Sequence, residues 1–131
     1  MGQFKDWNDV KNYAVQKLGG SELENGSVAF ELPNPGDSSR DQYITVFGAG
    51  NGQWVKFITI VCSADQMSYE EALTYNLGRL AGFLALGNGL IWMVHAQSIE
   101  TMDTDEFLGP LYILSKNADE LEKKHAGGDV F

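Results

Sequence analysis

The sequence has few of the residues that build disulfides and metal centres. It contains one cysteine, Cys62, and two histidines, His95 and His125. A single cysteine cannot form a disulfide within the chain, and it excludes a zinc site made of several cysteines. The two histidines also lack the HExxH spacing of a zinc protease. The sequence therefore predicts neither a metal ion nor another cofactor.

Basic residues are also scarce. Nine Lys and Arg stand against eighteen Asp and Glu, so the formal net charge is −9. The basic residues are scattered along the chain, and only Lys123 and Lys124 are adjacent. A surface of this kind repels a phosphate backbone, so no nucleic-acid partner is expected.

Long hydrophobic runs are missing as well. No apolar stretch approaches the roughly 20 residues that a membrane-spanning helix needs. The amino-terminal residues are polar and lack the hydrophobic region of a signal peptide. We therefore expect a cytoplasmic protein that has no membrane partner.

What the chain does contain is the composition of a globular domain. Its 131 residues are 44% hydrophobic and 11% aromatic, which is too apolar for a disordered chain. This length corresponds to one domain, since domains typically have roughly 100–200 residues. The sequence shows no internal repeat and no dividing linker, so we expect residues 1–131 to form a single domain.

The amino-terminal half predicts one helix followed by three strands. Apolar residues at spacings of three and four predict a helix over residues 4–18, ended by Gly19 and Gly20. Alternation of apolar residues and enrichment in β-branched residues predict the strands, over residues 27–32, 42–48 and 54–62.

Turn-forming residues separate these strands. Residues 33–39 predict a loop, and residues 49–53 predict a hairpin connection. The third strand is apolar on both faces, which is typical of a central strand. Its two faces carry Ile58 and Ile60 on one side and Val55, Phe57, Thr59 and Val61 on the other.

The carboxy-terminal half begins with a predicted helix over residues 68–84. Ser68 is a good N-cap, and Glu71 three residues later completes a capping box. Apolar residues at helical spacing predict a buried stripe made of Ala72, Leu73, Leu77, Leu80, Ala81 and Leu84. Gly78 and Gly82 within this segment are interpreted as sites of close packing against a strand or a partner helix.

A turn at residues 87–89 then leads to a predicted strand over 90–97, and the last helix is expected to begin near Asp103 or Thr104. Pro110 either kinks that helix or follows a short first turn. Whether a further strand forms after Gln97 stays open. The order of elements predicts an α+β fold, with an antiparallel sheet and helices packed on it.

Two segments raise the question of chemistry. The glycine-rich run 48–52 precedes a strand and not a helix, so it predicts a hairpin turn and not a phosphate loop. Cys62 and His95 could lie on adjacent strands as a catalytic pair. The simpler interpretation is a small buried thiol and a half-buried imidazole.

Several segments of the carboxy-terminal half carry a family resemblance. They are Ala72–Leu77, Ala81–Leu86, the turn Gly87–Gly89, Leu90–Val94, Phe107-Leu108 and Ala118–Leu121. Together they resemble the YbjN-like family of bacterial sensory transduction regulators and the structurally related type III secretion chaperones of the CesT type. The resemblance implies the order helix, three strands, helix, one or two strands, helix. It also implies a non-enzymatic dimer that binds another polypeptide.

We therefore expect a protein-binding module, chaperone-like or regulatory, which acts as a homodimer and docks a segment of a protein partner. The residues expected at the dimer interface are Leu77, Leu80, Phe83, Leu84 and Trp92. Those expected to meet the partner are Trp7, Tyr43 and Phe47. The alternative is a small-ligand-binding protein or an enzyme with a site near Cys62 and His95.

Overall fold

The computed structural model describes residues 3–34 and 37–125. Within them the chain forms three α-helices, one short 3₁₀ turn and a six-stranded antiparallel sheet of order β1-β2-β3-β4-β6-β5. The elements are α1 (Trp7–Leu18), β1 (Ser21–Glu22), β2 (Val28–Asn34), β3 (Asp37–Ala49), β4 (Trp54–Ser63), η1 (Ala64–Gln66), α2 (Tyr69–Leu77), β5 (Phe83–Gly87), β6 (Leu90–Ser98) and α3 (Thr104–His125). The predicted α+β class with an antiparallel sheet is confirmed.

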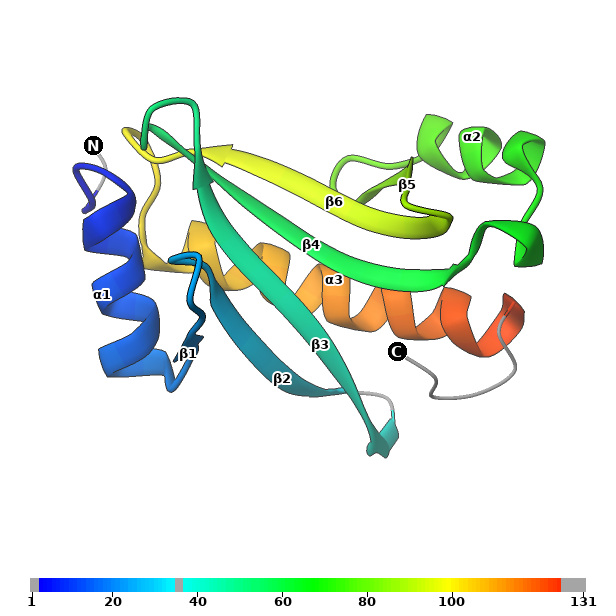
Figure 1. Ribbon diagram of the computed structural model, residues 1–131, viewed down its shortest axis with the longest axis horizontal. Helices are drawn as coiled ribbons and strands as arrows, with labels where there is room; N and C mark the ends of the chain where they lie inside the picture. The colour runs from blue at the N-terminus through cyan, green and yellow to red at the C-terminus, as the bar shows by residue number, and fades with distance from the viewer. Residues whose placement is uncertain (1–2, 35–36, 126–131) are drawn as a thin grey trace.

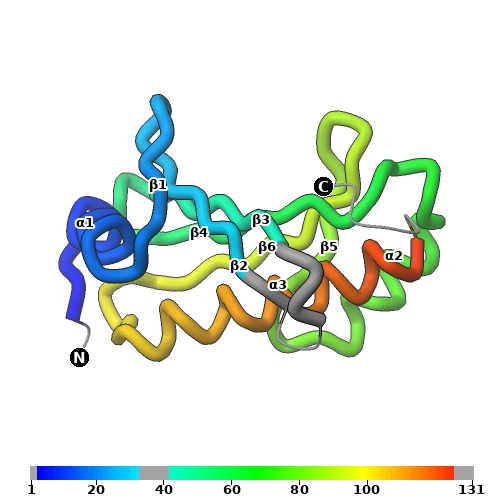
Figure 2. Tube along the Cα trace, turned by 90° about the horizontal axis from the view of Figure 1, so that it is seen from below, coloured from blue at the N-terminus to red at the C-terminus, as the bar shows by residue number. Residues whose placement is uncertain are grey.

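The helices are distributed unevenly around the sheet. The long helix α3 runs along one face, while α1 and α2 lie at opposite ends of the molecule (Figure 1). The view turned by 90° also shows α3 on one side of the strands (Figure 2). Within the described residues, no helix covers β3, β4 and β6 on the other side, which we call the helix-free face.

The core lies between the sheet and α3, and Phe107 is its centre. This fully buried residue of α3 makes ring contacts with Phe57 of β4, Phe30 of β2 and Tyr13 of α1, with centroid distances of 5.4, 6.5 and 6.2 Å. Offset and edge-on aromatic pairs of this kind add to the energy of burial. One side chain of α3 therefore joins the sheet and the first helix.

The prediction of a central third strand is confirmed. β4 lies between β3 and β6. Its residues Val55, Phe57 and Val61 are fully buried on the α3 side, while Ile58 and Ile60 are half-buried on the helix-free face. The pleat sends alternate side chains to opposite faces, so the sequence pattern was sufficient here.

The first helix starts slightly later than predicted, at Trp7. Asp6 is its N-cap, and the Asp6 side chain accepts a hydrogen bond from the Asp9 backbone N–H at 3.2 Å. The predicted end is confirmed, because Gly19 takes a left-handed conformation with φ of 74°. Glycine adopts this conformation without steric cost, which makes it a common helix terminator.

The loop predicted over residues 33–39 was wrong at both of its ends. β2 continues to Asn34 and β3 starts at Asp37, so the two strands form a hairpin. Pro33 pairs with Asp41, and the register shifts between Pro33 and Asn34. Proline is compatible with a strand at the rim of a sheet or at such an irregularity, which the turn signals did not reveal.

The predicted helix over residues 68–84 was too long. The Ser68 side chain caps it as expected, accepting a hydrogen bond from the Glu71 N–H at 3.1 Å. The helix ends at Leu77, however, and Phe83–Gly87 forms strand β5. Gly82 has φ of 76°, and a Cβ there would lie 3.1 Å from the Met93 sulfur. Gly82, interpreted from the sequence as a packing site inside a helix, therefore packs against β6 from the turn that follows α2.

The predicted buried stripe of this segment was also wrong in part. Ala72 and Leu84 are buried, but Leu73, Leu77 and Leu80 are exposed. The reason is that the chain leaves the helix at Gly78, turns, and pairs β5 with β6 through a hairpin at Asn88 and Gly89. Both turn residues have positive φ, which is the signature of a tight two-residue hairpin.

Two questions left open by the sequence now have answers. The additional strand is β5, and it precedes β6 in the sequence. After Gln97, β6 continues only to Ser98, and a turn that includes Thr101 then leads to α3. Pro110 lies within α3, which continues from Thr104 to His125. None of the described helices is long and apolar enough to cross a membrane.

Candidate functional site

Large apolar side chains gather on the outside of α2 and β5. Tyr69, Leu73 and Leu77 follow one another at four-residue spacing along one face of α2. Leu80 in the following turn is 99% exposed, and Leu77 is 88% exposed. Two exposed residues of the edge strand β5 lie beside them, Phe83 on one face of the strand and Leu86 on the other. We call the whole set the α2–β5 surface, which comprises Tyr69, Leu73, Leu77, Leu80, Phe83 and Leu86.

A shallow hollow occupies part of this surface. It measures about 220 Å³ and lies between α2 and β5, lined by Tyr69, Ala72, Leu73, Leu84, Ala85, Leu86 and Ile91. Every lining residue is apolar or aromatic. Contiguous exposed apolar area is uncommon on monomeric proteins and marks a surface that meets another molecule.

The structure separates the five residues expected at the dimer interface into two groups. Leu77, Leu80 and Phe83 are exposed on the α2–β5 surface. Leu84 is buried beneath it, and Trp92 is half-buried on the helix-free face, where its indole N–H donates to the Gly87 carbonyl at 2.9 Å. The first group is free to contact another molecule, while Leu84 supports the surface from below.

The side chain of Asn76 joins α2 to β5. Its Oδ1 accepts a hydrogen bond from the Leu84 backbone N–H at 2.6 Å, and its Nδ2 donates to the Leu84 carbonyl at 3.0 Å. The far end of the same helix region is tied to α3, since the Glu71 carboxylate lies 3.4 Å from the Lys124 ammonium and 3.0 Å from His125 Nε2. The two Asn76 bonds connect α2 directly to the β5 backbone, while the exposed Glu71–Lys124 pair adds little.

A second hollow lies at the other end of the molecule. It measures about 510 Å³ and is lined by Trp7, Lys11, Asn25, Gly26, Ser27, Phe47, Gly48 and Gly52. We call it the α1–β3 pocket. It arises because β2 begins at Val28, opposite Val46, so the last three residues of β3 have a strand neighbour on the β4 side only.

Trp7 and Phe47, both expected to meet a partner, are brought together in this pocket. Trp7 packs directly on β3: a Cβ atom at Gly48 would lie only 2.6 Å from Trp7 Cγ. Its backbone N–H also donates to the Gly52 carbonyl at 2.9 Å. Gly48 is thus required by helix packing, a role that reading the run 48–52 as a hairpin turn did not reveal.

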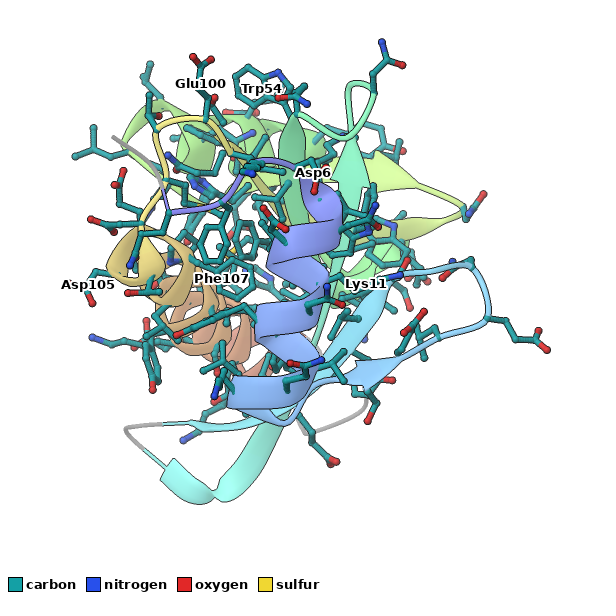
Figure 3. The ribbon with its side chains drawn as sticks, turned by 90° about the vertical axis from the view of Figure 1, so that its left-hand side faces the viewer. Asp6, Lys11, Trp54, Glu100, Asp105 and Phe107 are labelled. Carbon is teal, nitrogen blue, oxygen red and sulfur yellow. The ribbon has the colours of Figure 1, made fainter. Side chains whose placement is uncertain are left out.

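Charge at this end of the molecule is mixed. Figure 3 looks onto this end and labels Asp6 and Lys11 on the amino-terminal helix region. Lys11, which lines the pocket, pairs with Glu22 of β1 at 3.4 Å. A partly exposed pair of this kind contributes little to stability. The pocket therefore offers aromatic surface with one paired cation at its rim.

Tyr43, the third residue expected to meet a partner, lies outside the pocket. It is 49% exposed and occupies the same face of β3 as Phe47, because the two residues are four positions apart. At about 3.3 Å per residue, they lie about 13 Å apart along the strand. The three predicted residues thus form a surface that runs from the pocket onto the helix-free face.

The structure does not bring Cys62 and His95 together. On the neighbouring strand Cys62 pairs with Ile91, while His95 pairs with Phe57. Ile91 and His95 are four positions apart on β6, which is about 13 Å along the strand. A thiol and an imidazole at this distance cannot exchange a proton directly. The alternative of a catalytic site at these residues is not supported.

The environments of both groups are those of buried side chains. Burial raises the pKa of the Cys62 thiol, and the carboxylates of Asp65, Glu122 and Glu71 add to this. The thiolate needed for nucleophilic chemistry is therefore disfavoured. Among the described residues, no group of three or more His, Cys, Asp and Glu side chains could hold a metal ion.

Sequence reasoning missed three residues of the α2–β5 surface. Leu73 was assigned to the core, and Tyr69 and Leu86 were assigned to no site, yet all three line the hollow between α2 and β5. The spacing of Tyr69, Leu73 and Leu77 was visible in the sequence. It could not show whether that stripe faces the protein's own sheet or the solvent, because both give the same pattern.

Comparison with solved structures identifies the fold. The sequence itself matches no family model and no curated protein. A chain from the HopA1–SchA chaperone–effector complex is similar, with a TM-score of 0.61 and 10% identity over 93% of this chain and 91% of that chain. A chain from the Yersinia pestis type III secretion chaperone SycH in complex with a stable fragment of YscM2 has a TM-score of 0.63 and 14% identity, over 88% of this chain and 98% of that chain. This chain therefore has the α+β fold of type III secretion chaperones.

Proposed function

We propose that this protein is a non-enzymatic, single-domain protein-binding module that works as a homodimer in the cytoplasm. In this proposal two copies meet through the α2–β5 surface, and each copy docks a segment of a protein partner along Trp7, Phe47 and Tyr43. A chaperone-like role is favoured by the structural neighbours, which are named as chaperones in complex with other proteins. A regulatory role of the YbjN-like kind would use the same two surfaces.

The observation that carries this proposal is the exposure of Leu77 and Leu80. A leucine that is almost completely exposed loses the free energy of burial, about 1.5–3 kcal/mol per side chain. Covering these residues with their counterparts in a second copy recovers part of that energy. A two-fold axis through the α2–β5 surface gives such a contact, because the same patch is then used by both copies.

The docking part of the proposal is supported by the position of the aromatic residues. Trp7 and Phe47 line the α1–β3 pocket, and α1 lies at the opposite end of the molecule from α2 (Figure 1), while Tyr43 lies about 13 Å along β3 from Phe47. A dimer formed through α2 would leave them accessible. Aromatic side chains in concave or partly exposed positions are typical anchors for an extended segment of another protein.

The experiment that tests the homodimer is light scattering on purified wild-type protein and on Leu80→Glu. We expect the wild type to have twice the mass of 14.4 kDa and the variant to be a monomer. Leu80 is almost fully exposed, so the charge opposes association without disturbing the fold. Ile113→Glu is the matched control, because Ile113 is an exposed apolar residue on α3 and its variant should stay dimeric.

Two results would contradict the proposal. One is a wild-type protein that remains monomeric at high concentration. The other is a folded Leu80→Glu variant, verified by circular dichroism, that keeps the wild-type dimer mass. A Leu80→Glu variant that stays dimeric would mean that the α2–β5 surface is not the contact between copies.

A further inference from the structure

The outer edge of β5 is occupied by a side chain. β5 is the last strand in the sheet order, so among the described residues no strand lies on its outer side. Its hairpin with β6 pairs Gly87 with Leu90 and Ala85 with Trp92. Since backbone hydrogen bonds alternate in direction along a strand, the N–H and C=O groups of Leu84 and Leu86 point outward.

Asn76 provides Leu84 with both of the bonds that a neighbouring strand would make. The amide oxygen accepts from the Leu84 N–H at 2.6 Å and the amide nitrogen donates to the Leu84 carbonyl at 3.0 Å. A primary amide has one acceptor and one donor group side by side, which matches the two groups of a single outward-facing residue. Asn76 thus takes the position of one residue of an adjacent strand.

Apart from Asn76 and the neighbouring helix α2, no feature of the described residues protects β5 against strand pairing. Its sequence, Phe83-Leu84-Ala85-Leu86-Gly87, contains no charged residue and no proline. Phe83 and Leu86 are exposed beside it. A strand edge of this composition is a template for pairing with another chain unless something covers it.

The opposite edge of the sheet differs. There the short strand β1 pairs with Val28 and Ala29 of β2, and Pro33 further along β2 has no backbone N–H. Proline and a short terminal strand are common ways of limiting edge pairing. The two edges are therefore limited by different means, and on β5 that role falls to Asn76.

We propose that Asn76 acts as a surrogate strand that prevents two copies from joining their β5 strands into one continuous sheet. The copies then meet through the side chains of the α2–β5 surface. The contact between copies through these side chains is the part of the inference that rests on the proposed homodimer. β5 strands related by a two-fold axis would run antiparallel and could pair with each other, so a second copy is the occupant that the open edge would accept.

The inference is tested with Asn76→Ala, which removes both bonds, and with Asn76→Asp, which keeps only an acceptor. Each is made in the wild type and in Leu80→Glu, and the mass is measured by light scattering over a range of concentrations. We expect Asn76→Ala to form species of about twice the mass of its parent in the Leu80→Glu background, where the parent is a monomer. Asn76→Asp should associate less than Asn76→Ala. Asn12→Ala, an exposed asparagine on α1, is the matched control and should leave the mass unchanged.

Hydrogen exchange distinguishes this role from simple bracing of the turn between α2 and β5. In Asn76→Ala held at low concentration, the Leu84 amide should exchange about tenfold faster than in its parent, since it has lost a hydrogen-bond partner. At high concentration its protection should return, because a second β5 strand replaces the asparagine. Faster exchange at every concentration with an unchanged mass would overturn the inference.

The failure of the inference can be told apart from the failure of the homodimer. If the wild type is a monomer, the proposed homodimer is wrong, but the Leu80→Glu background still tests Asn76, because edge pairing does not use Leu80. If Asn76→Ala does not fold, Asn76→Leu decides the question, because leucine keeps the branched shape of asparagine without its donor and acceptor. A folded Asn76→Leu with its parent's mass at all concentrations would overturn the inference.

Discussion

His95 is half-buried on β6, with its ring 5.7 Å from that of Phe57. Burial lowers the pKa of this imidazole, and a hydrogen bond with the Gln97 side chain opposes the shift only in part. The folded protein therefore favours the neutral form. At the scale of one residue, this environment makes stability depend on pH.

We predict that the free energy of unfolding decreases as the pH is lowered through about 6.5, the ordinary value for histidine. Below that pH the unfolded chain binds a proton at His95 that the folded chain does not bind, so protons favour unfolding. Urea denaturation of the wild type and of His95→Gln between about pH 7.5 and pH 5 measures this. The difference in stability between the two proteins should change in favour of the variant as the pH falls. A difference that is independent of pH would contradict the prediction.

The contact between α1 and β3 depends on the absence of a side chain at Gly48. The nearest atoms to a Cβ at this position are Cγ, Cβ and Cδ1 of Trp7, at 2.6, 2.8 and 2.9 Å. These atoms lie close to the helix backbone, so they cannot move aside without moving α1. The position of α1 relative to β3 is thus determined where β3 passes beneath the Trp7 indole.

We predict that Gly48→Ala lowers the free energy of unfolding by about 1–3 kcal/mol, the usual cost of overpacking. The change should also disturb the α1–β3 pocket, which a shift in tryptophan fluorescence would report in a background where Trp54 and Trp92 are replaced by Phe. Gly109→Ala on α3 is the matched control. A Cβ at Gly109 meets nothing within 4 Å, and alanine is the better helix former there, so this variant should be neutral or slightly stabilised. Equal stability of Gly48→Ala and the wild type would contradict the prediction.

The elements show which patterns in the sequence could be interpreted and which could not. Strand β4 was predicted with the correct faces because two buried sheet faces require a continuous apolar run with a period of two. Strand β5 was missed because its first residues, Phe83 and Leu84, were assigned to the preceding helix, since Leu84 fits helical spacing with Leu77 and Leu80. Short apolar segments are ambiguous in this way, and here the hairpin at Asn88 and Gly89 determined the outcome.

The candidate sites were predictable to a similar degree. The residues named for self-association included three of the exposed side chains on the α2–β5 surface, Leu77, Leu80 and Phe83. The pairing of Trp7 with Phe47 in one pocket could not be derived, since it depends on β3 extending beyond β2. Long-range register of this kind is determined by tertiary packing and leaves no local signal.

At the scale of the whole molecule, the two surfaces lie at opposite ends of the same sheet. The α1–β3 pocket is formed by α1, β3 and the turns beside them, and the α2–β5 surface lies beyond β6. Figure 1 shows α1 and α2 at the two extremes of the long axis. Self-association and partner binding can therefore occur in the same molecule without competing for area.

We predict that peptides selected from a displayed random library on the wild-type protein carry apolar residues at alternate positions. Such residues match the two-residue period of the face that holds Tyr43 and Phe47. Tyr43→Asp should weaken their binding about tenfold or more, as is common for an aromatic anchor. Tyr112→Asp, which changes an exposed tyrosine on α3, is the control and should bind like the wild type. Undiminished binding to Tyr43→Asp would contradict the assignment of this face.

The position of the α1–β3 pocket at the far end from α2 has a consequence for how tightly a partner could be held. A dimer joined at α2 would present two identical pockets at its two outermost points. A partner chain with two suitable segments would engage the second pocket at an effective concentration set by the length of chain between those segments. The spacing of the segments, more than the affinity of either one, would then decide which partner chains remain bound.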